Sequence, residues 1–209
     1  MSKLSAFYYE NQIEAGCDEA GRGCLAGPVV AAAVILNQSY SIEALNDSKK
    51  LSEKIRKSLK NEITENVTSY AIGIVDEKGI DEINILNASI RAMHLAVEQL
   101  KIEPELLLID GNRFHRFKKI PHICIIKGDG KYQSIAAASI LAKTVRDEIM
   151  EQLHEEYPMY NWKKNKGYPT MDHREAIAKY GPSPYHRQSF KLLADKPNAT
   201  LFDEFPDVF

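Results

Sequence analysis

Hydrophobic residues gather in five short stretches that predict β-strands. Residues 13–21 and 28–36 flank a glycine-rich connection, which is typical of two antiparallel strands. Residues 67–75 alternate between apolar and polar positions, as a half-buried strand does. Two further apolar runs, ending at Asp110 and Asp129, have the composition of buried strands.

Three longer segments repeat their apolar residues at the spacing of a helix. They are residues 52–66, with Ser52 as the predicted N-cap, residues 83–100, and residues 134–157. The longest has a predicted core stripe made of Ile135, Ala138, Ala142, Val145 and Ile149. After Pro158, proline and glycine interrupt the chain around two short predicted helices, residues 170–180 and 185–193.

This order of elements predicts an α/β fold in which helices flank a mixed sheet. We expect the main domain in residues 1–157. Residues 158–209 are expected to form a small basic helical appendage with an acidic tail, packed on the same domain. The sequence gives no signal for an oligomer, so a monomer is expected.

The composition of the chain indicates the cellular compartment in which we expect it. The chain has 209 residues and a hydrophobic content of 44%, which is ordinary for a soluble globular protein. Its three cysteines form no C-x-x-C pair, and their odd number disfavours a disulfide framework. No signal peptide opens the chain, and its longest apolar run is far shorter than the roughly 20 residues of a membrane helix. We therefore expect a cytoplasmic protein without membrane association.

The distribution of charge is more informative than the net charge of −2. Residues 161–191 carry seven Lys or Arg against two acids, and residues 113–119 carry four basic residues and no acid. Such local patches can meet phosphate groups, although each patch taken alone fits ordinary solvated surface equally well.

Four acidic residues fall where predicted strands end: Asp18, Glu19, Asp110 and Asp129. If they share one edge of the sheet, their charges repel unless a cation lies among them, and oxygen ligands suit Mg²⁺ or Mn²⁺. Taken alone, Asp110 and Asp129 fit turn residues better than metal ligands. Neighbours on a regular strand point to opposite faces, so we expect a local bend to bring Asp18 and Glu19 to one site.

Other catalytic motifs are incomplete. The segment "KGDGKYQS" has Ile125 and Tyr132 where a phosphate-binding P-loop needs Gly and Ser or Thr, which disfavours an ATPase. Pro158 occupies the second histidine position of a zinc-protease helix, and no Gly-x-Ser-x-Gly elbow is present.

Several segments, in order from about residue 13 to residue 190, resemble the type 2 ribonucleases H (bacterial ribonuclease HII). They are "DEAGRG", "LAGPVVAAAVIL", "DSKKLS", "DGN", "KGD", "SIAAASILAKTVRD", "GYPT" and "YGPSPYHRQSF". The resemblance implies a ribonuclease H-like fold and cleavage of RNA in RNA–DNA hybrids. It also implies cutting on the 5′ side of a single ribonucleotide in duplex DNA, leaving 3′-hydroxyl and 5′-phosphate ends.

The same resemblance assigns residues. It implies that Asp18, Glu19, Asp110 and Asp129 are catalytic and bind Mg²⁺ or Mn²⁺. It implies that the backbone of Gly21, Arg22 and Gly23 reads the ribose 2′-hydroxyl, and that Tyr168 packs on the next sugar; from the residues alone, Tyr168 fits a core tyrosine. Cys24 stands where the family commonly has proline.

Phosphate contacts are expected from Lys49 and from Ser139, Lys143 and Arg146, which share one stripe of the long predicted helix. For Arg146, surface charge paired with an acid is the alternative. The rival functions are a DNA nuclease or recombinase of the same fold and a non-catalytic hybrid-binding module. The acidic–aromatic tail, residues 198–209, is either a docking peptide for a partner or a packed or frayed terminus.

Overall fold

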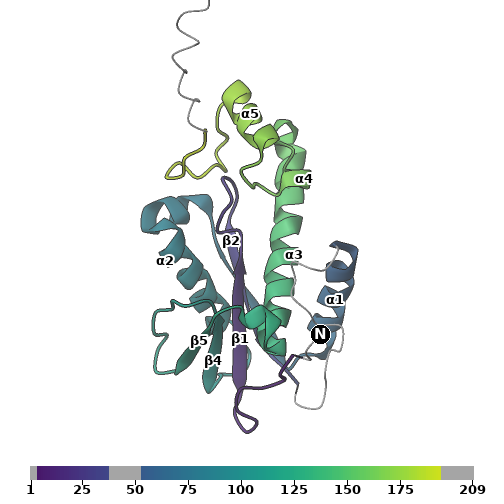
Figure 1. The fold of residues 1–209 in the computed structure, drawn as a ribbon, viewed down its shortest axis with the longest axis vertical. Coiled ribbons are helices and arrows are strands. Elements are labelled where there is room, and N and C mark those ends of the chain that lie inside the picture. The colour runs from purple at the N-terminus through teal and green to yellow at the C-terminus, as the bar shows by residue number, and fades with distance from the viewer. Residues whose placement is uncertain (1–3, 38–52, 194–209) are drawn as a thin grey trace, which may run out of the picture.

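A computed structural model of the chain describes residues 4–37 and 53–193. Five strands form one sheet in the order β3-β2-β1-β4-β5 (Figure 1). They are β1 (Glu14–Ala20), β2 (Val29–Ile35), β3 (Ser69–Val75), β4 (Leu106–Asp110) and β5 (His122–Ile125). β1 pairs antiparallel with β2 and parallel with β4, so the predicted mixed sheet and its first antiparallel pair are confirmed.

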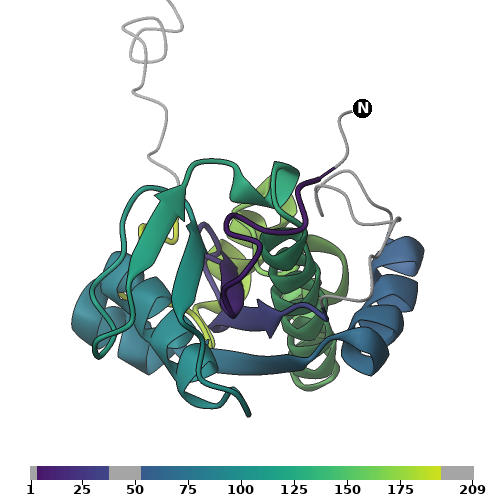
Figure 2. The same cartoon turned by 90° about the horizontal axis from the view of Figure 1, so that it is seen from below.

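Helices cover both faces of this sheet (Figure 2). α2 (Glu77–Glu98) packs on one face, whereas α3 (Gln133–Glu156) and α1 (Glu53–Asn66) lie on the other. β2 lies between the two layers and all seven of its residues are buried, which explains its unbroken apolar run. The predicted α/β fold with helices flanking the sheet is therefore confirmed. No helix within residues 4–37 and 53–193 is long and apolar enough to cross a membrane.

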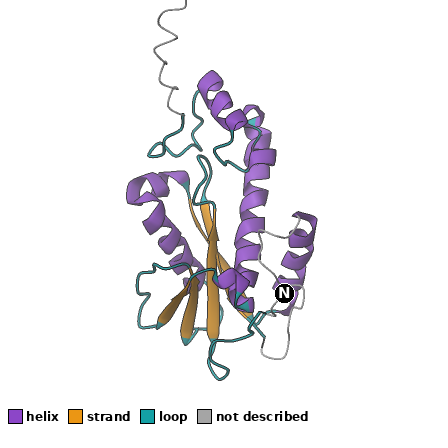
Figure 3. Ribbon diagram, viewed as in Figure 1, coloured by secondary structure: helices purple, strands orange, loops and turns teal. Residues whose placement is uncertain are grey.

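The remaining elements lie beyond one end of the sheet, next to the far end of α3 (Figure 3). They are η3 (Pro158–Tyr160), α4 (Trp162–Asn165) and α5 (Met171–Tyr180). Their apolar side chains form a separate core with residues from α3 and from the β1–β2 connection: Leu25, Ala26, Met150, Tyr160, Trp162 and Ile177. This part of the chain is thus held to the connection that follows β1.

Three predictions about local structure are wrong. Residues 185–193 are not a helix, because Arg187 N–H donates to Leu25 O and Tyr185 O accepts from Gly27 N–H, which pairs this segment with the β1–β2 connection. β5 ends at Ile125 instead of reaching Asp129, which lies in the one-turn helix η2 (Gly128–Gly130).

The third error concerns the core face of α3. Ile135, Ala138 and Ala142 are buried as predicted, but Val145 and Ile149 are only half-buried. Arg146 and Met150 are buried in their place, with exposures of 1% and 0%. The buried face thus turns by one residue where α3 leaves the sheet and meets the β1–β2 connection. An arginine at a core position is the feature that the hydrophobic pattern could not predict.

Candidate active site

The parallel pairing of β1 with β4 brings two of the predicted acids together. Cys17 lies opposite Ile109 in this ladder, and Asp18 and Asp110 are the next residues of the two strands. Both strands run in the same direction, so their carboxyl ends meet at one edge of the sheet, where α/β folds usually bind their ligands.

Glu19 reaches the same edge from the other face of the sheet. β1 is unbroken through Asp18 and Glu19, which pair in regular register with Ala32 and Ala31, so the bend that we expected is absent. Asp18 faces α3, and Glu19 lines a cavity of about 310 Å³ beside α2 together with Asp110. The two neighbours thus point to opposite faces, and Asp110, at the end of β4, lies close to both.

The electrostatics confirm that three of the acids are close neighbours. Burial, followed by the charges of Glu19 and Asp110, raises the pKa of Asp18 well above its usual value. Burial also raises the pKa of Glu19 despite the opposing charge of Arg22, whose Nη1 lies 3.2 Å from Glu19 Oε1. The Ser139 hydroxyl and the Glu19 N–H, at 2.7 Å, both donate hydrogen bonds to the Asp18 side chain. These contacts hold a carboxylate in place at a site that disfavours its charge.

Asp129 joins this edge through the glycine before it. Gly128 N–H donates a 2.7 Å hydrogen bond to Asp110 Oδ1, which holds the first turn of η2 against the end of β4. Asp129 follows directly and is 4% exposed. Asp110 thus comes from the end of β4, whereas Asp129 comes from the turn that follows β5.

The donor chemistry of these residues fits a hard divalent cation. All four side chains offer only oxygen, and Glu19 Oε2 is buried without a hydrogen bond in the described part of the chain. Within residues 4–37 and 53–193, however, no three His, Cys, Asp or Glu side chains are grouped closely enough to surround one ion. The acids are neighbours without forming a complete ligand shell, and metal binding by Asp18, Glu19, Asp110 and Asp129 stays a prediction.

The loop after β1 is held by two buried arginines. Arg146 of α3 donates from Nε to Pro28 O, from Nη1 to Lys166 O and from Nη2 to Ala26 O, at 2.8–3.0 Å. Arg187 donates from Nη1 to Arg22 O at 3.1 Å and from both Nε and Nη2 to Gly27 O. Because buried carbonyls need hydrogen-bond donors, these side chains fix the course of the loop.

Arg146 is therefore not a phosphate contact, nor is it paired with an acid at the surface. It is 1% exposed and its donors are used by backbone carbonyls. Gly21 lies directly against it, with φ of 99°, and a Cβ at this position would come within 2.1 Å of Arg146 Nε. Only glycine fits both the backbone angle and the space.

The other predicted phosphate contacts have different outcomes. Ser139 is buried and binds Asp18, and its phosphate contact stays a prediction. Lys143 Nζ forms a 2.5 Å ion pair with Asp147 and keeps 27% of its side chain exposed, and its phosphate contact stays a prediction. Lys49 lies outside the described residues.

Tyr168 lies beside the same loop. Its ring is 41% exposed, and its hydroxyl forms a hydrogen bond with the buried thiol of Cys24. Its carbonyl accepts a 2.9 Å hydrogen bond from His173 Nδ1, because a carbonyl can only accept. The residue that departs from the family pattern, Cys24, is thus in contact with the tyrosine predicted to meet the substrate.

Two buried histidines, His173 and His186, stabilise the segment that carries Tyr168. His173 Nε2 accepts a 3.0 Å hydrogen bond from Trp162 Nε1 and lies 3.2 Å from His186 Nε2. His186 Nδ1 accepts from the N–H of Ser183. These contacts require a neutral His186 with its proton on Nε2, and they give it a structural role.

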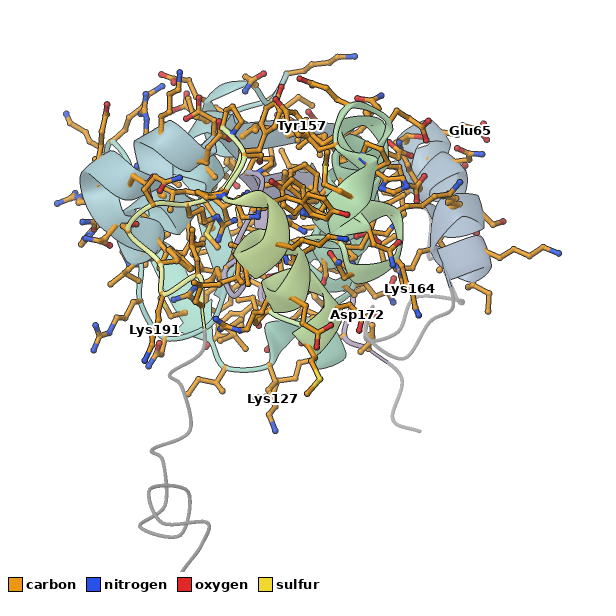
Figure 4. All side chains as sticks on the ribbon, turned by 90° about the horizontal axis from the view of Figure 1, so that it is seen from above. Glu65, Lys127, Tyr157, Lys164, Asp172 and Lys191 are labelled. Carbon is orange, nitrogen blue, oxygen red and sulfur yellow. The ribbon has the colours of Figure 1, made fainter. Side chains whose placement is uncertain are left out.

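Sequence reasoning missed Arg187 entirely. A single arginine in a polar segment gives no periodic signal of burial, and its partners are carbonyls about 160 positions away in the chain. Seen from above, helix α5 lies over the middle of the molecule, and the side chains of Lys127 and Lys191 project outward at its periphery (Figure 4).

Comparisons with known proteins agree with the resemblance. The family model described as Ribonuclease HII matches residues 15–193. A ribonuclease HII from Bacteroides thetaiotaomicron is 60% identical over 192 residues, which cover 92% of this chain and 96% of that protein. The crystal structure of ribonuclease H2 from Pyrococcus horikoshii OT3 matches with a TM-score of 0.71 and 28% identity, covering 86% of this chain and 94% of the other. Bst-RNase HIII in complex with Mn²⁺ has the same fold, with a TM-score of 0.69 and 22% identity over 86% of this chain and 67% of the other.

Proposed function

The chain belongs to the ribonuclease HII family and is a ribonuclease H type endonuclease, and from that membership we propose that it removes ribonucleotides from DNA. Its substrates are RNA–DNA hybrids and duplex DNA that contains single ribonucleotides. The cut lies on the 5′ side of the ribonucleotide and leaves 3′-hydroxyl and 5′-phosphate ends. The observation that carries the proposal is the meeting of Asp18, Glu19 and Asp110 beside the Gly21–Gly23 loop.

In this proposal, Asp18, Glu19, Asp110 and Asp129 would hold Mg²⁺ or Mn²⁺, which supplies activation of the attacking water and stabilisation of the leaving oxygen. The protein's own contribution is to position the carboxylates. Ser139 and the Glu19 N–H orient Asp18, and Gly128 N–H orients Asp110. Burial, together with mutual repulsion, raises the pKa values of Asp18 and Glu19, and both effects make this edge of the sheet a favourable place for a cation.

Recognition of the ribose follows from the Gly21–Gly23 loop. In the described residues, the N–H groups of Arg22 and Gly23 make no hydrogen bond, so they are available to a ligand. A Cβ on Gly23 would meet nothing within 4 Å, which leaves the backbone open to close approach by a sugar. A 2′-hydroxyl both donates and accepts, so it is a suitable partner for backbone groups, and deoxyribose would leave them unsatisfied.

Tyr168 contributes a flat, half-exposed ring on the other side of this loop. A sugar without a 2′-hydroxyl can pack on such a ring, which is the contact proposed for the deoxyribose next to the ribonucleotide. The hydrogen bond between the Tyr168 hydroxyl and Cys24 limits the movement of the ring, and the bond that its carbonyl accepts from His173 limits that of its backbone. Of the two proposed parts of the chain, residues 1–157 and 158–209, the second contains Tyr168 and would hold it in place.

Incision of a DNA duplex with one ribonucleotide, beside an all-DNA duplex of the same sequence, tests the proposal. Metal-dependent cutting of the first duplex alone is expected. Equal cutting of both would instead indicate a DNA nuclease of the same fold, and tight binding without incision would indicate a hybrid-binding module.

A further inference from the structure

We propose that the connection between β4 and β5, residues 111–120, is a second phosphate-binding surface that holds the duplex beyond the cut site. We call it the basic loop. The inference rests on the proposed function, because the ligand is the phosphodiester backbone of the same substrate. In Figure 1 the basic loop stands out from the sheet at its β4–β5 end, away from the appendage that carries Tyr168.

The basic loop is anchored by three apolar side chains. Phe114, Phe117 and Ile120 recur at every third position and pack against the core beneath α2, where Phe117 and Ile120 are each 8% exposed. His94 of α2 packs edge-on to Phe114, and its Nε2 donates a 2.9 Å hydrogen bond to His115 O. The loop is therefore held in one conformation without any ligand, which reduces the entropy lost on binding.

The residues next to these anchors include four cations that face solvent. Arg113, Arg116, Lys118 and Lys119 are all exposed. In the described part of the chain, none of the four forms a salt bridge; Lys118 Nζ lies 5.1 Å from the ring centroid of Phe117 instead. Two cations of α1 are paired by contrast, Lys60 with Glu148 and Lys57 with Glu151. The loop itself contains no acid, and the α2 residue His94 that packs on it lies near both Arg91 and Glu98.

The basic loop is continuous with the candidate active site. Asn112 and Arg113 line the same cavity of about 310 Å³ as Glu19 and Asp110. From Arg113 to Lys119 the chain can extend at most about 20 Å. Because each strand of a duplex places a phosphate roughly every 3.4 Å along the axis, this reach covers several phosphates next to the scissile one.

An open row of cations suits a polyanion better than a small anion. A single phosphate is usually bound by buried donors that surround it, whereas the cations of the basic loop are spread along the surface. Contacts of this kind neutralise backbone charge irrespective of sequence, and they release counterions when they form. They add affinity and hold the duplex in register without contributing to recognition of the ribose.

The test is the salt dependence of binding, measured in an Asp110→Asn background so that the duplex stays intact. Fluorescence anisotropy gives the affinity of a duplex with one ribonucleotide across a range of salt concentrations. The double variant Arg113→Gln/Arg116→Gln should reduce the slope of log K against log salt by about 1.8, since each lost phosphate contact contributes about 0.9. The matched control Lys54→Gln/Lys101→Gln removes the same charge at α1 and at the β3 edge, and should leave the slope within about 0.3 of the parent value.

Shortening the duplex distinguishes direct contacts between the basic loop and phosphates from a general effect of the protein's net charge. Removing the arm that lies on the basic loop should bring the parent and the double variant to the same slope, whereas shortening the other arm should preserve their difference. Equal slopes for parent and double variant on the full duplex would overturn the inference. That result leaves the proposed function standing if the unmodified protein still cuts the ribonucleotide duplex and spares the all-DNA control.

Discussion

Gly128 N–H donates a 2.7 Å hydrogen bond to Asp110 Oδ1, and this contact joins the end of β4 to the turn that carries Asp129. A Cβ at Gly128 would come within 2.6 Å of Ile135 Cδ1 and 3.4 Å of Asp110 Oδ1. The glycine thus allows η2 to approach the carboxylate and supplies the donor that orients it. Hydrogen bonds of this kind, one step removed from a metal, commonly affect its affinity.

Gly128→Ala should therefore weaken metal binding while leaving the acids themselves intact. Displacing the turn from Asp110 is expected to raise the Mn²⁺ concentration for half-maximal incision about 10-fold. Gly130→Ala is the matched control, because it lies in the same turn and its added Cβ would meet nothing within 4 Å. A metal titration of both variants decides: identical titration curves would show that the contact does not orient the carboxylate.

Asp110→Asn should stabilise the protein in the absence of metal. Burial raises the pKa values of Asp18 and Glu19, and the charge of Asp110 adds to this by repulsion. The amide removes that charge while its oxygen can still accept from Gly128 N–H. With EDTA at pH 7, the free energy of unfolding is expected to rise, because the remaining carboxylates lose one repelling charge.

Urea unfolding with and without Mn²⁺ measures this effect. Metal should stabilise the unmodified protein by binding to its folded state, and the variant should respond far less. A variant that is less stable than its parent in EDTA would mean that the three carboxylates do not repel one another as the structure indicates.

Arg146→Lys should loosen the loop that is proposed to read the ribose. Lysine has one ammonium group and cannot serve the carbonyls of Ala26, Pro28 and Lys166 together. We expect a loss of about 2–4 kcal/mol in unfolding free energy, since buried carbonyls lose their donors. Selectivity for the ribonucleotide duplex over all-DNA should fall in variants that still fold.

Arg91→Lys is the control for this exchange, because Arg91 is exposed on α2. The two variants are compared at a temperature where both remain folded by circular dichroism. Unchanged selectivity in folded Arg146→Lys would show that recognition of the ribose does not depend on the buried guanidinium.

The histidine pair predicts how stability depends on pH. Burial, and then the nearby His173, lowers the pKa of His186 from 6.5 to about 4. The folded state therefore holds fewer protons than the unfolded state between these values. The resulting stability is fully present above pH 6.5 and is lost as pH falls through 4, with a total of about 3 kcal/mol.

His186→Gln removes this titration. Between pH 6.5 and 4, the unfolding free energy of the variant should fall less steeply than that of its parent, by up to about 1.4 kcal/mol per pH unit. Urea unfolding at several pH values gives both slopes. Parallel slopes would show that His186 is not held neutral in the folded protein.

The fold could be predicted well from the sequence because apolar residues recur at clear intervals along its strands and helices. The acids were found for the same reason, since Asp18 and Asp110 each follow a buried apolar run whose end can be read from the pattern. Arg146 and Arg187 could not be found that way, because their partners are backbone carbonyls, which every residue has. The segment 185–193 was misread as a helix because its backbone pairs with residues 25–27, a contact that local periodicity does not contain.

Ser139 shows the same limit in the site itself. Its place on one stripe with Lys143 was correctly predicted, but its partner, Asp18, comes from a strand that lies more than a hundred positions earlier in the chain. Spacing gives the face of a helix on which a residue lies. It does not show which strand end will be next to it.

The most direct measurement of the central claim is incision of a duplex with a single ribonucleotide by the unmodified protein and by Asp110→Asn. The account predicts cutting on the 5′ side of the ribonucleotide that requires Mg²⁺ or Mn²⁺, and no cutting of the all-DNA control. Asp110→Asn should cut at least about 1,000-fold more slowly, as expected when metal-assisted stabilisation of about 4 kcal/mol is lost, while it binds the duplex within about threefold of its parent. Turnover by Asp110→Asn at the parent's rate, or equal cutting of the all-DNA duplex, would contradict the account.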